Sequence, residues 1–286
     1  MEWNRKQEAE PLKINTVGNV TYMTFPALEE TGMVSHAFST RMGGVSRGKF
    51  STMNFSFTRG DDPACVMENY RRMGAVLDAD VSRMVLSHQT HTTNVRVVTE
   101  EDAGKGVVRE RDYTDVDGMI TNIPGMTLVT FYADCVPLYL LDPVHRAIGL
   151  SHSGWRGTVG RMGKATLDAM KQEYGTEPKD VIACIGPSIC QDCYEVGEEV
   201  AAAFAGAFDE RYHSRLFYRK PNGRYQLSLW RANQIIFAEA GVAEHNIHTT
   251  DICTHCNPGF LFSHRTMGNE RGNLAAFLCL REQQNP

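Results

Sequence analysis

AIGLSHSGWRGTVGRMGKATLDAMKQEYG, residues 147–175, is the stretch that decides the fold class. Its first six residues are mostly apolar and predict a strand, and the two glycines of the SGWRG segment permit a sharp turn after it. Residues 158–174 then carry apolar side chains on one helical face, and Gly175 is typical of the position just after a helix. A strand that passes through a glycine turn into a helix indicates mixed α and β structure.

The same patterns recur on both sides of this stretch. A helix is expected after Asp62-Pro63, because aspartate is a good N-cap and proline suits the first helical position. Strands and helices are interspersed without a repeat, a linker or a strict βαβ order, which favours mixed sheets. We therefore predict one α/β (α+β) domain over residues 14–286, preceded by a loose polar segment, residues 1–13. The further expected strands are 20–25, 34–38, 84–87, 95–98, 126–133, 182–185, 247–253 and 275–280, and the further helices lie near 197–208 and 228–240.

The composition excludes several classes of protein. The 286 residues include 29 Lys+Arg and 34 Asp+Glu, and this slightly acidic balance argues against nucleic acid as the main partner. No run approaches the ~18 apolar residues that a membrane-spanning helix needs, and the first ten residues lack the apolar core of a signal peptide. We expect a cytoplasmic protein whose 8 cysteines are thiols, ligands or nucleophiles rather than a disulfide framework.

Three expected strands end beside a side chain that can bind a metal or act as a nucleophile. These side chains are His91 in SHQTH, Cys135 in ADC, and His152 in SH. Strand ends at one edge of a sheet can converge, and two histidines with one cysteine suit a catalytic zinc that keeps a fourth position open. The alternative stays open that each is a structural residue, since strand-end histidines are often hydrogen-bonded and cysteines are often simply buried.

Two glycine-rich segments are candidates for binding an anion. The first, STRMGGVSRG at 39–48, contains Arg41 and Arg47, and the second, GWRG at 154–157, contains Arg156. Backbone N–H groups in such loops and at helix N-termini favour negative charge. We assign Arg41, Asn54 and Arg265 to substrate or phosphate binding. In the alternative interpretation, the glycines only permit turns and the arginines are solvated.

Two CxxC pairs, Cys190/Cys193 and Cys253/Cys256, are far apart in the sequence. Two such pairs normally indicate a structural zinc, but the gap is much longer than the usual about 15–20 residues. A second metal site, a reducible disulfide and unrelated buried thiols stay open as alternatives. The sequence does not decide whether the four cysteines meet.

Several motifs occur together, and in the same order, in one known family. They are QTH at 89–91, ADCVP at 133–137, HSGWRG at 152–157, IGP at 185–187 with YEVG at 194–197, and FSHR at 262–265. The chain resembles the bacterial YfiH/YlmD family, also called the laccase-domain or multicopper polyphenol oxidase family, with the animal protein FAMIN as a relative. Near the C-terminus that family usually reads TGRM, where this chain has ERGN at 270–273.

The resemblance, which extends from about residue 34 to 280, implies both a fold and an activity. The fold is a single-domain α/β sandwich with mixed sheets flanked by helices, and the cofactor is zinc held by His91, Cys135 and His152. The activity is phosphorolysis of adenosine, inosine and guanosine to a base and ribose 1-phosphate. Phosphorolysis of 5′-methylthioadenosine and deamination of adenosine to inosine are also implied, so the small-molecule partners would be purine nucleosides and phosphate.

The expected catalytic residues are Cys135, Asp134 and Arg156. Deamination needs a carboxylate that transfers a proton, and Asp134 would be either that base or a support for its neighbour Cys135. Two other enzyme classes stay open. A Cys–His hydrolase acting on peptidoglycan precursors would use Cys135 as nucleophile and His152 as base. A copper polyphenol oxidase would hold Cu²⁺ at the same three residues, but the 10 histidines include no His-x-His pair.

A non-enzymatic binding module is the third alternative, and it would leave the metal triad, the anion loop and the arginines without a purpose. The sequence leaves the preferred nucleoside, the physiological pathway and the oligomeric state open.

Overall fold

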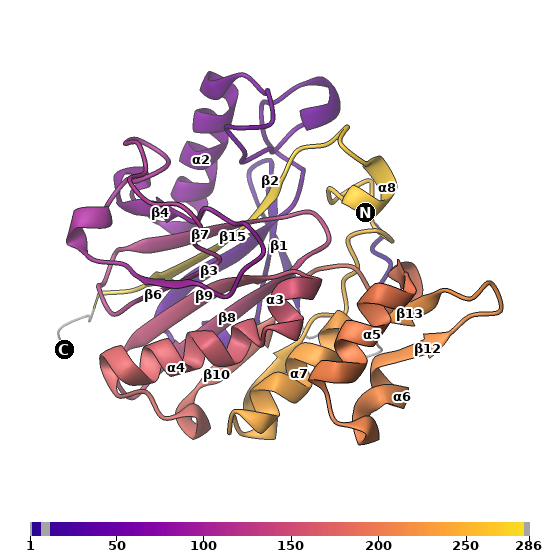
Figure 1. The fold of residues 1–286 in the computed structure, drawn as a ribbon. Coiled ribbons are helices and arrows are strands. Elements are labelled where there is room, and N and C mark those ends of the chain that lie inside the picture. The colour runs from indigo at the N-terminus through magenta and orange to yellow at the C-terminus, as the bar shows by residue number, and fades with distance from the viewer. Residues whose placement is uncertain (1, 7–11, 283–286) are drawn as a thin grey trace.

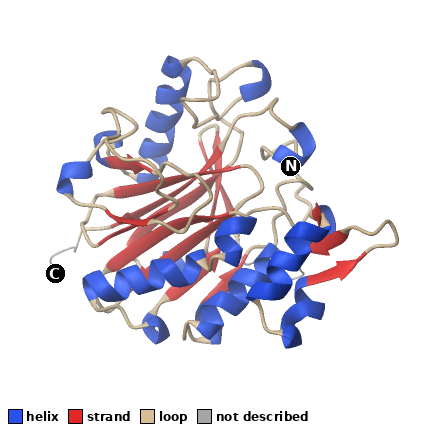
Figure 2. Ribbon diagram, in the orientation of Figure 1, coloured by secondary structure: helices blue, strands red, loops and turns tan. Residues whose placement is uncertain are grey.

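The computed structural model describes residues 2–6 and 12–282, which form a layered α/β sandwich. Two six-stranded sheets pack face to face, and a third, three-stranded sheet lies at one end (Figure 1). Helix α2 covers the outer face of the first sheet, while α4 and α7 cover the outer face of the second (Figure 2). The predicted single-domain α/β sandwich with mixed sheets is confirmed.

The first sheet is antiparallel except for one parallel pair, β4 with β7. In spatial order its strands are β1 (Lys13–Val17), β2 (Val20–Thr24), β3 (Val34–Ser39), β15 (Leu274–Leu280), β7 (Thr127–Tyr132) and β4 (Met84–Leu86).

The second sheet has parallel pairs at both edges and an antiparallel centre. Its order is β14 (Ile247–Thr249), β10 (Ile182–Ile185), β8 (Val136–Asp142), β9 (Ala147–Ser153), β6 (Gly118–Thr121) and β5 (Val95–Val97). The third sheet has the order β11 (Glu195–Val196), β13 (Tyr225–Leu227) and β12 (Phe217–Arg219).

Three of the four helices predicted from the sequence are single helices in the structure, the fourth is divided in two, and three helices of four residues each are not predicted. Helix α2 begins as predicted, because Asp62 accepts a hydrogen bond from the N–H of Ala64 at 2.9 Å. The single helix predicted over 158–174 is two helices, since Arg161 adopts a left-handed conformation with φ 62° between them. The helices are α1 (Pro26–Glu29), α2 (Pro63–Leu77), α3 (Trp155–Val159), α4 (Met162–Tyr174), α5 (Glu198–Ala207), α6 (His213–Leu216), α7 (Leu229–Glu239) and α8 (His264–Met267).

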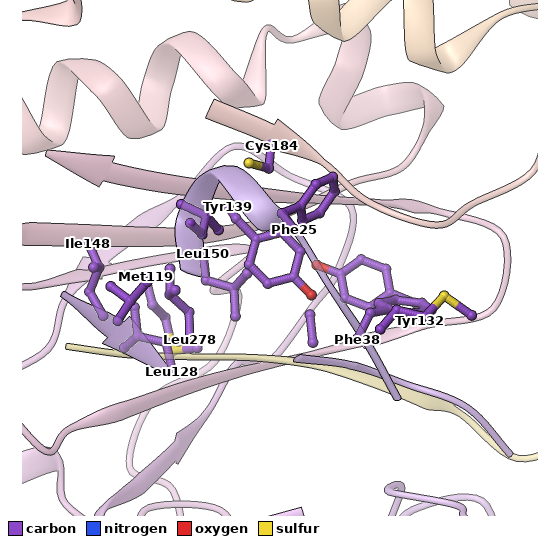
Figure 3. Close-up of a cluster of buried hydrophobic side chains, with 14 of the residues drawn as sticks. Phe25, Phe38, Met119, Leu128, Tyr132, Tyr139, Ile148, Leu150, Cys184 and Leu278 are labelled. Carbon is purple, nitrogen blue, oxygen red and sulfur yellow. The ribbon is translucent and has the colours of Figure 1, made fainter. Parts of the chain in front are cut away.

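The core lies between the two large sheets and contains two buried tyrosines that join them (Figure 3). The hydroxyl of Tyr139, on β8, donates to the carbonyl of Ala37 on β3 at 2.9 Å. In the opposite direction, the hydroxyl of Tyr132, on β7, donates to the carbonyl of Ser151 on β9 at 3.0 Å. Because a buried hydroxyl must be hydrogen-bonded, these contacts fix how one sheet is placed on the other.

The N-terminal segment predicted to be loose, residues 1–13, is described only in part, since residues 1 and 7–11 lie outside the described residues. Within residues 2–6, the Trp3 ring packs on Phe260 with centroids 4.4 Å apart, and the N–H of Lys6 donates to the carbonyl of Asp251 at 2.9 Å. Across residues 2–6 and 12–282, no helix has both the length and the apolar character to cross a bilayer.

Candidate metal and substrate site

The register of the second sheet brings together residues from three segments. Strands β8 and β9 pair so that Pro137 lies opposite His152, which places Cys135, just before β8, beside that histidine. Strand β6 pairs with the other side of β9, and the N–H of His152 donates to the carbonyl of Asp117 at 2.8 Å. His91 comes from the loop after β4, on the first sheet.

The ligand atoms of His91, Cys135 and His152 all lie within 4.8 Å of one another. The Nε2 of His91 is 4.0 Å from the Sγ of Cys135, and the two imidazole rings meet edge to face with centroids 4.9 Å apart. This convergence is the one that the strand ends predict. Two imidazole nitrogens and one thiolate are a donor set that suits zinc and leaves a coordination position for water or substrate.

The carboxylate of Asp117 holds the two histidines in place. It accepts hydrogen bonds from Nδ1 of His152 at 2.8 Å and from the backbone N–H groups of Thr90, His91 and Thr92 at 2.8–3.1 Å. His152 is thereby left with Nε2 for a metal, the arrangement by which carboxylates usually orient metal-binding histidines. His91 has a left-handed backbone with φ 68°, which these N–H bonds stabilise.

Cys135 and His152 perturb each other's proton affinity. Burial raises the pKa of the Cys135 thiol. His152 and, after it, His91 lower this pKa by a larger amount, so that the net result is a pKa of about 6, below the usual value for a thiol. Burial lowers the pKa of His152, whereas Cys135 and Asp117 raise it, to about 9. The two histidines therefore favour the thiolate form of Cys135, which is the form that binds metals and attacks electrophiles.

A cavity of about 650 Å³ opens in front of these residues. Its size is within the range of small-molecule sites. His91, Cys135 and His152 form part of its wall, so the free coordination position would face the cavity. The other lining residues include His88, Phe131, Asp134, Tyr194, His264, Arg265 and Arg271.

Two further residues predicted from the sequence, Asp134 and Arg265, line this cavity. Both carboxylate oxygens of Asp134 are engaged, one by the hydroxyl of Thr254 at 2.6 Å and the other by the backbone N–H of Arg265 at 2.7 Å. The guanidinium of Arg265 lies over the Tyr194 ring and donates to the carbonyl of Glu195 at 2.9 Å. Asp134 thus ties helix α8 to the start of β8.

The other three predicted residues lie outside the cavity wall. The guanidinium of Arg41 donates to the carbonyls of Ser51 at 2.8 Å and Pro258 at 3.0 Å. The side chain of Asn54 is buried and bonded to the loop around it, including the N–H of Asn273 at 2.9 Å. Arg156 lies over the neighbouring Trp155 ring, 4.3 Å from its centroid.

Arg271 is a cavity residue that the sequence analysis did not assign. Its side chain is buried, burial and then Arg59 lower its pKa to about 10, and among the described residues its Nε has no hydrogen-bond partner. One of its terminal nitrogens donates to Oδ1 of Asn273 at 2.5 Å.

The fold and the site define an α/β sandwich protein with a His–Cys–His candidate metal centre at the wall of a cavity. The sequence profile described as "Multi-copper polyphenol oxidoreductase laccase" matches residues 35–281, and the chain belongs to that family, the YfiH/YlmD family of the sequence analysis.

Named relatives of the chain carry two activities. It is 32% identical to "Purine nucleoside phosphorylase YlmD" of Bacillus subtilis, over 86% of this chain and 88% of the relative. It is 35% identical to "Adenosine deaminase RL5" of an unknown prokaryotic organism, over 82% and 90%. The crystal structure of YlmD from Geobacillus stearothermophilus matches 96% of this chain and 100% of its own, with 30% identity and a TM-score of 0.87. These relatives support an enzyme of this family.

Proposed function

We propose that the chain is a zinc-dependent purine nucleoside phosphorylase that also cleaves 5′-methylthioadenosine and deaminates adenosine. The observation that carries the proposal is the convergence of His91, Cys135 and His152 at the wall of a cavity that also holds an incompletely hydrogen-bonded arginine, Arg271. The names of the relatives supply the substrate class, since one is a purine nucleoside phosphorylase and another an adenosine deaminase.

His91, Cys135 and His152 would hold the zinc, with Asp117 fixing both histidines. When bound there, zinc supplies a Lewis acid that lowers the pKa of a water molecule it binds, which deamination at C6 of adenine requires. The low pKa of Cys135 suits this role, because a thiol must lose its proton to become a ligand. Phe131 and Tyr194 are among the residues that line the cavity, and aromatic side chains can stack on a purine ring.

Arg271 and Arg265 would bind the phosphate of the phosphorolysis reaction. A phosphate oxygen attacks C1′ of the ribose, the glycosidic bond breaks, and the departing base takes the bonding electrons and a proton. Arg271 suits the phosphate because it is a buried cation with an unpaired N–H, and a bound anion would satisfy both its charge and that donor. Arg41 is a weaker candidate, since backbone carbonyls already occupy its guanidinium.

We assign to His88 a hydrogen bond that stabilises the departing base, and to Asp134 a supporting role. Both oxygens of Asp134 already accept strong hydrogen bonds, which favours support of helix α8 over a role as base. The Nδ1 of His88 accepts the N–H of Asp115 at 3.2 Å, so its neutral ring carries its proton on Nε2. His88 lines the cavity, and that N–H can donate a hydrogen bond to the departing purine, which takes its proton from water.

The test is to incubate the zinc-loaded protein with adenosine, with and without phosphate, and to identify the products by mass. Adenine with ribose 1-phosphate, formed only with phosphate, is the expected sign of the phosphorylase. Inosine in both reactions is the expected sign of the deaminase, and adenine with 5-methylthioribose 1-phosphate is expected from 5′-methylthioadenosine. Unchanged nucleoside in all reactions would overturn the proposal, provided that the protein contains stoichiometric zinc. A Cys135→Ala variant is the matched control and should be inactive.

A Cys–His hydrolase is the second candidate, because Cys135, His152 and Asp117 also form a thiolate, an imidazolium and an orienting carboxylate in line. That mechanism gives no role to His91, whose Nε2 also faces the sulfur. His91→Ala therefore separates the two candidates. Zinc chemistry predicts loss of both metal and activity, whereas a nucleophile would keep activity after complete metal removal and lose it on alkylation of Cys135.

A further inference from the structure

A second cluster of metal-binding side chains lies outside the cavity. Strands β10 and β14 are parallel neighbours, so the loops that follow them leave the same edge of the second sheet. The first loop contains Cys190 and Cys193, and the second contains Cys253 and Cys256. Each cysteine of one pair lies 63 positions from its counterpart in the other. Their long separation in sequence is therefore bridged by the pairing of two strands.

The four sulfur atoms are spaced for one tetrahedral ion. All of them lie within 4.8 Å of one another, and the sulfurs of Cys193 and Cys256 are 3.4 Å apart. A zinc ion with four bonds of about 2.3 Å separates its sulfurs by about 3.8 Å. A disulfide, in contrast, needs about 2.05 Å between sulfurs, and all four cysteines are free thiols in this structure.

The surroundings of the cluster suit thiolate ligands. Cys190 and Cys253 are buried, while Cys193 and Cys256 are half-buried. The backbone N–H of Cys190 donates to the sulfur of Cys253 at 3.2 Å, a contact that stabilises negative charge on sulfur. Lys6 and Cys190 line the same surface depression, and the ammonium of Lys6, which is 3.7 Å from Asp192, also interacts with Cys190 and Cys256.

We propose that Cys190, Cys193, Cys253 and Cys256 hold a second zinc ion, distinct from the one at His91, Cys135 and His152. Four protein ligands leave no position for water or substrate, so this site is structural. Two CxxC turns are the usual way to present four thiolates to zinc, and binding would replace their four protons with one ion. The proposal does not depend on the activity of the cavity.

The second zinc would fix one wall of the cavity. A short parallel bridge joins Ser188 to Cys253, and the N–H of Thr254 donates to the carbonyl of Ser188 at 3.1 Å. Between the two sites, Thr254 donates to Asp134, and the N–H of Ile189 donates to the carbonyl of Asp134 at 3.0 Å. Loss of this zinc would loosen the loops that carry Ile189 and Thr254, and with them the position of Asp134.

The test measures metal content and the ligands of the metal, without reference to activity. Protein purified under reducing conditions should contain two zinc ions per chain. Cys135→Ala should contain one, and X-ray absorption of that variant should show four sulfur neighbours at about 2.3 Å. Cys193→Ser with Cys256→Ser should also contain one, with a mixed nitrogen and sulfur shell. Cys65→Ser, which changes a cysteine outside both clusters, is the matched control and should keep two.

Three results would overturn the proposal. One is a Cys135→Ala protein that folds but holds no zinc after dialysis into zinc-containing reducing buffer. Another is iron in place of zinc at this site. The third is a chain mass lower by two hydrogens for each cysteine pair, with no reactive thiols at the four positions, which would make the cluster a pair of disulfides. Because wild type and Cys135→Ala suffice for the metal count, the outcome stands even if the double variant fails to fold.

Discussion

Replacing Asp117 with asparagine tests whether one carboxylate organises the His–Cys–His site. One oxygen of Asp117 accepts from the backbone N–H groups of Thr90 and Thr92, and the other accepts from the N–H of His91 and from Nδ1 of His152. An asparagine has one oxygen and one NH₂ group. Whichever way its amide is turned, the NH₂ group faces two donors that have lost their acceptor.

The magnitude follows from those lost contacts. A buried donor without an acceptor costs about 1–3 kcal/mol, so two of them lower the free energy of unfolding by about 2–6 kcal/mol. Loss of the carboxylate behind a metal-binding histidine lowers metal affinity by about 10- to 100-fold, or about 1.4–2.8 kcal/mol. Asp117→Asn should therefore bind zinc at this site much more weakly, even under conditions in which the variant is fully folded.

The assay is competition for zinc between the protein and a chelating dye at neutral pH. The zinc that Cys135→Ala fails to bind is the one assigned to this site. Asp115→Asn is the matched control. Asp115 is on the same segment and accepts hydrogen bonds from the side chains of Thr90, Thr92 and Asn94, but it does not contact His152. An unchanged zinc affinity in Asp117→Asn, or an equal loss in Asp115→Asn, would refute the assignment of this role to Asp117.

Three further predictions concern single positions. Gly154→Ala should weaken zinc binding, because its new methyl group would lie 2.8 Å from the His91 side chain. Gly197→Ala is the control, since Gly197 is also a helix N-cap but has open space around it, and it should not weaken zinc binding. Equal zinc affinities of the two variants would exclude the steric reason. Burial, together with Arg281, lowers the pKa of His36 to about 3, so its stabilising effect is complete above pH 6.5 and declines as the pH falls. Between pH 7.5 and 5.5, the free energy of unfolding in urea should fall by about 1.4 kcal/mol more for the wild type than for His36→Gln. An equal fall in both proteins would count against a neutral His36. Arg271→Met should raise the KM for phosphate about 10- to 100-fold, since a charged hydrogen bond contributes about 1.5–3 kcal/mol, and an unchanged KM would remove Arg271 from the phosphate site.

The strand pattern predicts four of the six strands of the second sheet but neither β6 nor β8, which contains a proline. Proline in an apolar run argues against a central strand, and Pro137 is the second residue of this one. The structure accommodates it because the pairing of β8 with β10 begins only at Leu138, so the missing N–H removes no bond from that ladder. Nothing in the local sequence reveals where the neighbouring strand ends.

The glycine-rich segment at 39–48 shows where composition misleads. Its two adjacent glycines predict a binding loop for an anion, with Arg41 and Arg47 as its positive charges. In the structure, a methyl group at Gly44 would lie 2.0 Å from the carbonyl oxygen of Thr52, and one at Gly43 would lie 2.1 Å from that of Asn19. The glycines therefore allow backbone segments to approach each other, a requirement that depends on residues distant in sequence.

The sequence does not decide the role of the cysteine pairs, for a related reason. The usual spacing rule for two CxxC turns describes turns carried by one compact ribbon, in which the chain between them is short. Here the intervening chain includes α5, α6 and α7 and the third sheet, and the two turns meet because β10 and β14 are adjacent and parallel. Sequence spacing cannot report a contact that is made by the pairing of strands.

The geometry of the candidate metal site, in contrast, follows from strand register once β8 and β9 are paired. Cys135 directly precedes one strand of a hairpin and His152 lies on the other, so their proximity follows from antiparallel pairing alone. His91 comes from the other sheet, and the pairing of β8 with β9 says nothing about its position. The link is Asp117, which lies next to β6. Its carboxylate accepts hydrogen bonds from Nδ1 of His152 and from three successive backbone N–H groups of the loop that carries His91. A residue that carries no ligand atom therefore determines whether the three ligand atoms meet, which is why its removal is the most direct test of the site.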